Sequence, residues 1–213
     1  MFSSRSATSN SSAPSTPALP QIAATHPNNN ESLAPATGEF IMEHPTEEIV
    51  DATRLREIRK LVEANNQSSL SSDIIICQIY MESRFDKNAH AQGSSARGLM
   101  QLLKAPVREL ARLANLAKAP KDRRPETELY READAFHDSP QFVDEATNIR
   151  TGTAYLQALI KKNTAAGAKF PIVEAFKDYR GIRNGLYFSK IQTAANKLAA
   201  NPDSMQILWD MVQ

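Results

Sequence analysis

From about residue 45 onward, apolar residues recur at the spacing of an α-helix, and alternation of the strand type is confined to short ambiguous runs. Between residues 45 and 67 the apolar positions on one helix face are Val50, Leu55, Ile58, Leu61 and Val62. Such a stripe is buried against neighbouring helices when a chain folds. The pattern therefore predicts an all-α fold that opens with an amphipathic helix.

Further segments with helical spacing follow along the chain. They are residues 71–83, 106–117, 127–136, 140–163, 171–178, 186–199 and 202–211. Proline stands near the start of several of them, where its missing amide hydrogen removes no helical hydrogen bond. Either Ser71 or Ser72 is suited to cap the first of these helices, because a serine hydroxyl accepts a hydrogen bond from a free backbone N–H.

The first 44 residues differ in composition from the rest. They are rich in Ser, Thr, Ala and Pro and contain few large apolar side chains. A segment of this kind cannot bury enough surface to offset the entropy of ordering it. We expect residues 1–44 to be a disordered Ser/Pro-rich tail and residues 45–213 to form one domain, large enough to fold without a metal or a disulfide.

Charge and composition argue against several classes of function. The formal net charge is +1, so no strong field attracts nucleic acid or an anionic membrane. The single cysteine, Cys77, stands among isoleucines and is expected in the core. The four histidines are scattered, no apolar run is long enough to span a membrane, and no glycine-rich phosphate loop is present. We expect no metal, no cofactor, no nucleic acid and no membrane span.

Glu82 occupies an unusual place for an acidic residue. The predicted helix 71–83 is apolar nearly all round, and Glu82 lies in its last turn, with only Gln78 beside it on a polar corner. Burial and the negative end of the helix dipole both disfavour a carboxylate there, which suits an acid catalyst. The simpler interpretation is that Glu82 forms an ion pair with Arg84 or another cation.

Glycine is scarce, with seven in the chain, so its positions are informative. Gly93 and Gly98 bracket a Ser-Ser-Ala turn, and Gly181 follows Tyr179 and Arg180. Gly152 lies inside a predicted helix, where it costs about 1 kcal/mol relative to alanine. We expect another backbone or a ligand to approach Gly152 closely.

Three blocks of sequence together resemble the lysozyme-like soluble lytic transglycosylases and their relatives, including goose-type lysozymes. The first block is Ile79-Tyr80-Met81-Glu82-Ser83-Arg84-Phe85 with the turn Gly98-Leu99-Met100-Gln101, the second is Asn148-Ile149-Arg150-Thr151-Gly152-Thr153-Ala154-Tyr155-Leu156, and the third is Ala175-Phe176-Lys177-Asp178-Tyr179-Arg180-Gly181. The resemblance covers about residues 71–191. It implies a lysozyme-like helical domain that binds peptidoglycan glycan strands.

The resemblance also implies roles for individual residues. Glu82 would be the general acid and base that cleaves the β-1,4 bond between N-acetylmuramic acid and N-acetylglucosamine. The residues implied to contact the sugars or orient the acid are Ser83, Met100, Gln101 and Tyr179, and those of the motif framework are Gly98, Asn148, Gly152, Tyr155 and Gly181. Packing or capping is the simpler interpretation for Met100, Asn148 and Tyr155.

Two departures from the family pattern stand out. Arg180 occupies a position where the family usually has asparagine, and the interval between Gln101 and Asn148 is longer than usual. The arginine at position 180 is expected to change part of the sugar-contacting loop. The longer interval predicts a helical insertion within residues 102–147, which would give the cleft a wall that differs from the family's.

The reaction type stays open at the level of sequence. A hydrolytic glycosidase usually needs two carboxyl groups, whereas a lytic transglycosylase needs one, because the muramic acid's own 6-hydroxyl attacks and leaves a 1,6-anhydro end. We expect transglycosylation. The candidates for a second carboxylate, which would favour a hydrolytic muramidase used as a secreted effector or phage lysin, are Asp86, Asp144, Glu145 and Asp178. A domain that binds glycan without cutting it, and a helical adaptor, are the non-enzymatic alternatives.

The expected route to the substrate is unusual. The amino terminus lacks the apolar stretch of an ordinary signal peptide, so we expect synthesis in the cytoplasm followed by action in the periplasm or outside the cell. A specialised secretion or lysis route would carry the protein there, with residues 1–44 as its leader. A secretion-apparatus partner or a dedicated immunity partner is expected on that route.

Overall fold

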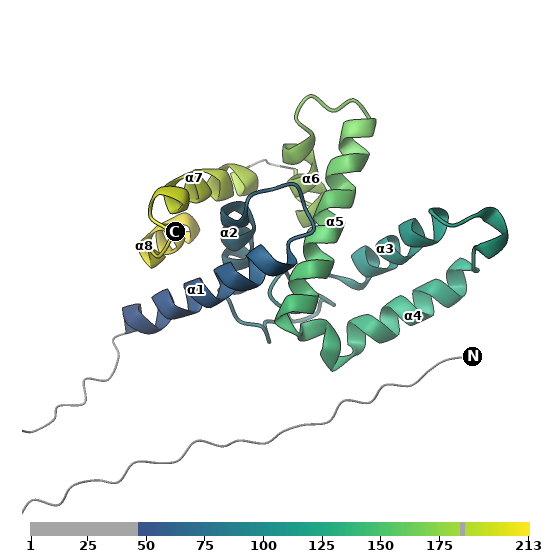
Figure 1. Ribbon diagram of the computed structural model, residues 1–213, viewed down its shortest axis with the longest axis horizontal. Helices are drawn as coiled ribbons and strands as arrows, with labels where there is room; N and C mark the ends of the chain where they lie inside the picture. The colour runs from purple at the N-terminus through teal and green to yellow at the C-terminus, as the bar shows by residue number, and fades with distance from the viewer. Residues whose placement is uncertain (1–46, 184–185) are drawn as a thin grey trace, which may run out of the picture. The chain divides into compact units, whose positions relative to one another are not determined.

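The protein is all-helical over the residues described by a computed structural model, 47–183 and 186–213 (Figure 1). The helices are α1 (Glu47–Asn65), α2 (Ser72–Ser83), α3 (Lys104–Leu116), α4 (Glu126–Asp138), α5 (Glu145–Ala165), α6 (Pro171–Arg180), α7 (Leu186–Ala200) and α8 (Met205–Val212), with 3-10 turns η1 (Pro120–Asp122) and η2 (Pro140–Val143). The predicted all-α fold is confirmed. The predicted tail, residues 1–44, lies outside the described residues. Within the described ranges, no helix is both long enough and apolar enough to cross a membrane.

The segment predicted as one helix over residues 140–163 is divided in the structure. Pro140–Val143 forms the turn η2, and Asp144 then caps α5 by accepting a hydrogen bond from the backbone N–H of Thr147 at 2.9 Å. An aspartate at this position satisfies a free amide of the first helical turn. Asp144 is therefore a structural cap of α5.

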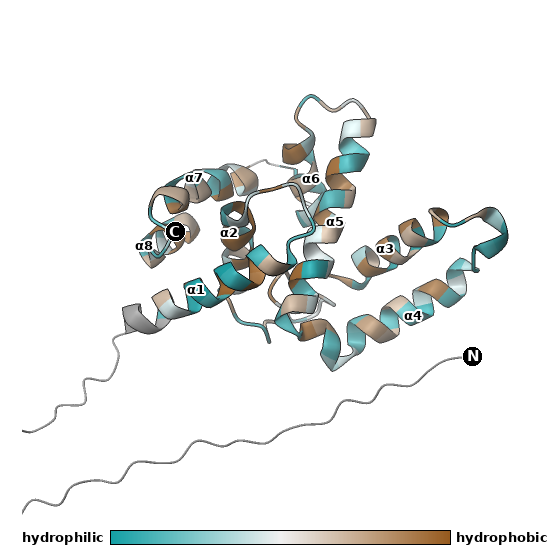
Figure 2. Ribbon diagram, in the orientation of Figure 1, coloured by the Kyte–Doolittle hydropathy of each residue, from teal (hydrophilic) through white to brown (hydrophobic). Residues whose placement is uncertain are grey.

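Helix α2 lies at the centre of the core and packs against α1, α7 and α8. Figure 2 shows it as largely hydrophobic, in contrast to the mixed surface of α1. Ile75, Ile76 and Ile79 are fully buried, each stabilising the fold by about 1.5–3 kcal/mol relative to an exposed side chain. Cys77 is buried beside them, as expected, and burial raises the pKa of its thiol to about 12, which leaves it protonated and unreactive.

Within residues 102–147, where the sequence predicts a helical insertion, α3 and α4 form a hairpin. The two helices pack on each other, and Arg108 pairs with Asp134 between them. At the base of the hairpin, Arg97 donates to the backbone oxygen of His137, and the buried ring of His137 contacts the backbone oxygen of Leu102 at 3.0 Å. The hairpin is thus attached directly to the turn that precedes it.

Gly152 lies on the face of α5 that meets the Gly98–Gln101 turn. A Cβ atom at position 152 would lie 2.9 Å from Cβ of Met100 and 3.0 Å from Cδ1 of Leu102. The predicted close approach is present, but side chains make it, whereas a backbone or a ligand was expected. Met100 is fully buried in this contact, so the absence of a side chain at position 152 sets how closely the turn packs on α5.

We predict that Gly152→Ala lowers the free energy of unfolding by about 1–3 kcal/mol, because the added methyl group overpacks the contact with Met100. Urea denaturation of the full chain measures this. The double variant with Met100→Ala should lose less stability than the two single variants added together, since it removes the Met100 sulfur, the atom nearest to the added methyl group. Helix propensity alone would make Gly152→Ala more stable by about 1 kcal/mol, and that result would contradict the packing explanation.

Candidate active site

Glu82 projects from the last turn of α2 into a partly open pocket. The helix ends at Ser83 because Arg84 and Phe85 adopt left-handed backbone conformations, with φ of 54° and 65°. Arg84 caps the helix by donating its backbone N–H to the carbonyl oxygen of Tyr80 at 3.0 Å. The Glu82 side chain is 11% exposed. The helix end therefore holds a carboxyl group at the edge of the core, as the sequence pattern predicts.

Two side chains lie next to the carboxyl group of Glu82, although both come about a hundred residues later in the sequence. The hydroxyl of Tyr187, in the first turn of α7, donates a hydrogen bond to Oε1 of Glu82. A guanidinium nitrogen of Arg180, at the end of α6, lies 3.8 Å from the same oxygen. Arg84, the cation suggested by the sequence, instead donates to the carbonyl oxygens of its own helix and covers the ring of Tyr80.

Burial and the neighbouring groups shift the pKa of Glu82 in opposite directions. Burial raises the pKa of this carboxyl above its ordinary value, because a charged form is poorly solvated there. The hydrogen bond from Tyr187 and the charges of Arg180 and Arg84 lower the pKa, but by less than burial raises it. The net direction is upward, which favours an acid that is protonated nearer neutral pH than an exposed glutamate.

The Gly98–Gln101 turn is fastened to α5 by the side chain of Asn148. The fully buried Asn148 accepts a hydrogen bond from the backbone N–H of Met100 at 2.9 Å and donates to the carbonyl oxygens of Arg97 and Phe142 at 3.3 and 3.2 Å. Gly98, at φ 76°, leaves room for this amide, because a Cβ atom there would lie 2.6 Å from its Cγ. Asn148 and Gly98 therefore serve as framework residues.

Tyr179 reaches the same turn from α6. Its hydroxyl donates to the carbonyl oxygen of Met100 at 2.8 Å, and its ring lies 5.8 Å from that of Tyr155. Burial raises the pKa of Tyr179 well above its usual value, so the hydroxyl stays a donor. Gly181 follows in a left-handed conformation, with φ of 68°, and ends α6.

The remaining residues expected to contact substrate divide into two groups. Gln101 lines the pocket, and its side-chain amide donates to the carbonyl oxygens of Ala89 and Gly98 at 2.8 and 2.9 Å. Ser83 and Met100 do not line it: the Ser83 hydroxyl donates to the Ile79 carbonyl of its own helix at 3.1 Å, and Met100 is buried against Gly152. Both side chains are buried, and neither is among the residues that line the pocket.

The pocket beside Glu82 has a cavity volume of about 370 Å³. Its walls come from α2, from the turn that carries Gln101, from the start of α3 and from the end of α6. The lining residues are Met81, Glu82, Ala91, Ser94, Ala96, Gln101, Leu102, Leu103, Pro106, Tyr155, Tyr179 and Arg180. Glu82 is the only carboxylic acid among them, and no group of three metal-ligating side chains occurs elsewhere in the described ranges.

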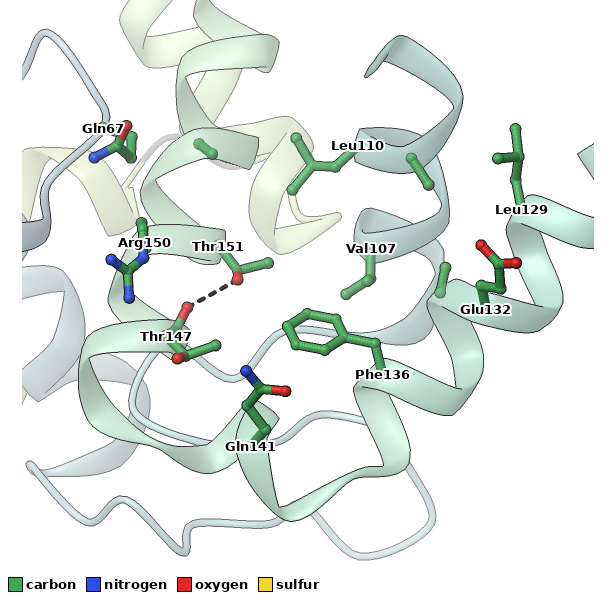
Figure 3. A pocket seen from close by; sticks show the side chains of 13 residues that line it. Gln67, Val107, Leu110, Leu129, Glu132, Phe136, Gln141, Thr147, Arg150 and Thr151 are labelled. Atoms are coloured by element: carbon green, nitrogen blue, oxygen red, sulfur yellow. Dashed lines mark hydrogen bonds between the residues drawn. The ribbon is translucent and has the colours of Figure 1, made fainter. Parts of the chain in front are cut away.

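A larger hollow of about 680 Å³ lies between the α3–α4 hairpin and α5 (Figure 3). Val107, Phe136 and Thr151 are among the residues that line it. Its single carboxyl group, that of Glu132, is already bound by the guanidinium of Arg124 at 2.6 and 2.9 Å. This hollow offers no acid for glycoside chemistry, so the smaller pocket at Glu82 is the candidate active site.

The four candidates for a second catalytic carboxylate lie outside the pocket and bind other groups there. Asp144 caps α5, Glu145 pairs with Arg54, and Asp86 accepts from the backbone N–H of Asn88 at 2.8 Å. Asp178 binds the side-chain amide of Asn163 at 3.1 Å and the guanidinium of Arg183 at 2.9 Å. None of them lines the pocket of Glu82.

Tyr187 is the residue of this site that sequence reasoning missed. It lies 105 positions after Glu82 and outside the three motif blocks, at the start of α7. No local spacing connects it with Glu82. Arg180, noted only as a departure from the family pattern, was the sole sign in the sequence that this side of the pocket is unusual.

We predict that Glu82→Gln is more stable than the natural protein at about pH 8 and that this advantage shrinks as the pH falls. The folded-state pKa of Glu82 is raised, so between the unfolded and folded pKa values the folded protein binds more protons than the unfolded chain. The natural protein therefore loses stability as the pH rises through that window, whereas glutamine does not ionise. Urea unfolding across this range measures the difference, with the exposed Glu63→Gln as control; equal stability at high pH would contradict the burial effect.

The family comparison agrees with this geometry. The model of the Transglycosylase SLT domain matches residues 61–173, more than half of the 213 residues, a range that includes Glu82, the Gly98–Gln101 turn, the hairpin and all of α5. Comparison with curated proteins gave no match, and comparison with solved structures gave none either. The match ends before Tyr179, Arg180 and Tyr187. The chain belongs to the transglycosylase SLT domain family and is a peptidoglycan lytic transglycosylase-type enzyme.

Proposed function

We propose that this enzyme cleaves the β-1,4 bond between N-acetylmuramic acid and N-acetylglucosamine, with Glu82 as its only catalytic carboxyl group, and leaves 1,6-anhydro ends. The supporting observation is the lining of the pocket, in which Glu82 is the single carboxylic acid. Hydrolysis through two carboxylates would need a second one across the sugar from the first. A reaction with an internal nucleophile needs none.

The proposed reaction uses the Glu82 proton twice. Glu82 first donates its proton to the glycosidic oxygen, and the bond between that oxygen and C1 of the muramic residue breaks. The 6-hydroxyl of the same residue then attacks C1, and its proton passes to the Glu82 carboxylate. The acid is restored, the new bond closes the 1,6-anhydro ring, and no water is consumed.

The surroundings of Glu82 are suited to both halves of this cycle. Burial favours the protonated form needed for the first step. Tyr187, as a hydrogen-bond donor, and Arg180, as a nearby positive charge, stabilise the carboxylate that remains after it. A group that must alternate between acid and base works best when neither form is strongly preferred.

The other motif residues receive different roles in this proposal. Gln101, Tyr155 and Tyr179 line the pocket and are proposed to contact the sugars. Ser83 and Met100 are proposed to act indirectly, because they do not line the pocket and instead hold the α2 end and the turn in place. Contact between substrate and these two side chains is not part of the proposal.

We predict that digestion of purified cell-wall sacculi yields fragments with anhydro-muramic ends, detected by mass spectrometry as products lacking the mass of one water. Glu82→Gln should lower the rate by at least about a hundredfold, the contribution expected of a general acid. Glu63→Gln, which changes an exposed carboxyl group, should digest at the natural rate.

Other products would identify the alternatives. Reducing muramic ends would overturn transglycosylation and establish a hydrolytic muramidase. Binding to sacculi without any released fragment would establish a glycan-binding domain. Undiminished digestion by Glu82→Gln would overturn the assignment of the acid itself.

We also propose that the protein reaches the cell wall by a specialised secretion or lysis route, with residues 1–44 as the leader. Support comes from their Ser/Pro-rich composition and from the location of peptidoglycan outside the cytoplasmic membrane. A secretion-apparatus or immunity partner belongs to the same proposal. Deleting residues 1–44 should abolish export from the producing cell and leave the purified enzyme active; export at the natural level would overturn the leader assignment.

A further inference from the structure

Arg180 carries unused hydrogen-bonding capacity inside the pocket. A guanidinium has five N–H donors, yet within residues 47–183 and 186–213 none of those of Arg180 makes a hydrogen bond. Its nearest acidic atom, Oε1 of Glu82, is 3.8 Å away and already accepts from Tyr187. The Arg180 side chain is 33% exposed and lines the pocket, so its free donors are accessible to a ligand.

The guanidinium of Arg180 is held in place although it is not hydrogen-bonded. Its central carbon lies 4.5 Å from the ring centroid of Tyr187. A guanidinium stacked on an aromatic ring keeps its plane fixed while its edge stays free to form paired hydrogen bonds. Tyr187 is itself fixed by its bond to Glu82, so Arg180 is preorganised beside the acid.

Arg183 shows how differently a neighbouring arginine is placed. It follows Arg180 by three residues, is 70% exposed, and pairs with Glu174 at 3.3 Å and with Asp178 at 2.9 Å. Its charge is therefore balanced by two carboxylates outside the pocket. Among the described residues, Glu82 at 3.8 Å is the one acidic group that pairs with Arg180.

We infer that Arg180 forms a carboxylate-binding site in the catalytic pocket and holds a carboxylate that the muramic acid side of the glycan carries beside the scissile bond. The inference rests on the proposed function. A planar guanidinium edge matches a carboxylate through two parallel hydrogen bonds. N-acetylglucosamine is neutral, so the site selects for the other sugar of the strand.

Two parts of peptidoglycan supply this chemistry. A peptide-free strand exposes the carboxylate of the lactyl group of muramic acid, and a strand that retains its stem peptides carries carboxylates on those peptides. Both are bound by the same guanidinium edge. The enzyme is therefore expected to distinguish glycans by charge at this position as well as by sugar identity.

Binding measurements in a Glu82→Gln background test the inference without turnover. Two kinds of glycan strand serve as probes, one free of peptide and one that retains its stem peptides. Each kind is tested in two forms, one with free carboxylates and one whose carboxylates have been converted to methylamides. Adding Arg180→Gln should weaken binding of at least one carboxylate-bearing probe about tenfold, as expected for charge-assisted hydrogen bonds in a partly exposed site, and leave both methylamide probes unchanged. Which probe responds identifies the source of the carboxylate.

Two further variants separate a bound carboxylate from a general charge effect. Arg183→Gln removes the same charge from outside the pocket and should bind every probe normally. Arg180→Lys keeps the charge but lacks the planar edge, so its affinity for the responding probe should lie between those of arginine and glutamine. Thermal unfolding of each variant verifies that it is folded.

Two results would overturn the inference: equal loss by Arg180→Gln for charged and methylamide probes, or no loss for either charged probe. If either result is obtained and the protein with natural Glu82 still produces anhydro ends, the proposed function stands and only the carboxylate site is rejected. A natural protein that neither binds nor cuts any strand would reject both.

Discussion

The amide of Asn148 is the interaction on which the geometry of the site depends. It pairs with three backbone groups, the N–H of Met100 and the carbonyl oxygens of Arg97 and Phe142. Each buried polar group left unpaired costs about 1–3 kcal/mol, so the turn has little freedom to move away from α5. With the turn fixed, the Met100 carbonyl is positioned to anchor Tyr179. One buried amide thus connects α5, the turn and α6.

Glu82 depends on a second set of contacts, which act on its charge. Its position at the end of a buried helix favours the neutral form, and Tyr187 and Arg180 moderate that preference. These two residues belong to the carboxyl-terminal part of the chain, beyond the range that the family model matches. The acid lies inside the matched range, and the two residues that act on its charge come from the end of α6 and the start of α7, outside that range.

Sequence reasoning was strongest where the determinants are local. The all-α fold, the placement of Glu82 in the last turn of α2 and the close packing at Gly152 follow from periodicity and from the cost of glycine in a helix. The partners of Glu82 could not be predicted, because Tyr187 is 105 residues distant and only tertiary packing brings it near. The burial of Ser83 and Met100 depends on where the left-handed residues after α2 turn the chain, and periodicity does not encode that point.

The attachment of the α3–α4 hairpin has a consequence for how such enzymes diversify. Arg97 and His137 close the base of the hairpin, and Leu102, at the end of the turn, shares that closure. A change of length at the far end of the hairpin, around η1, would leave these contacts at its base in place. The start of the hairpin, at Leu103 and Pro106, lines the pocket of Glu82, whereas no residue around η1 does, so variation at that far end would leave the pocket lining unchanged.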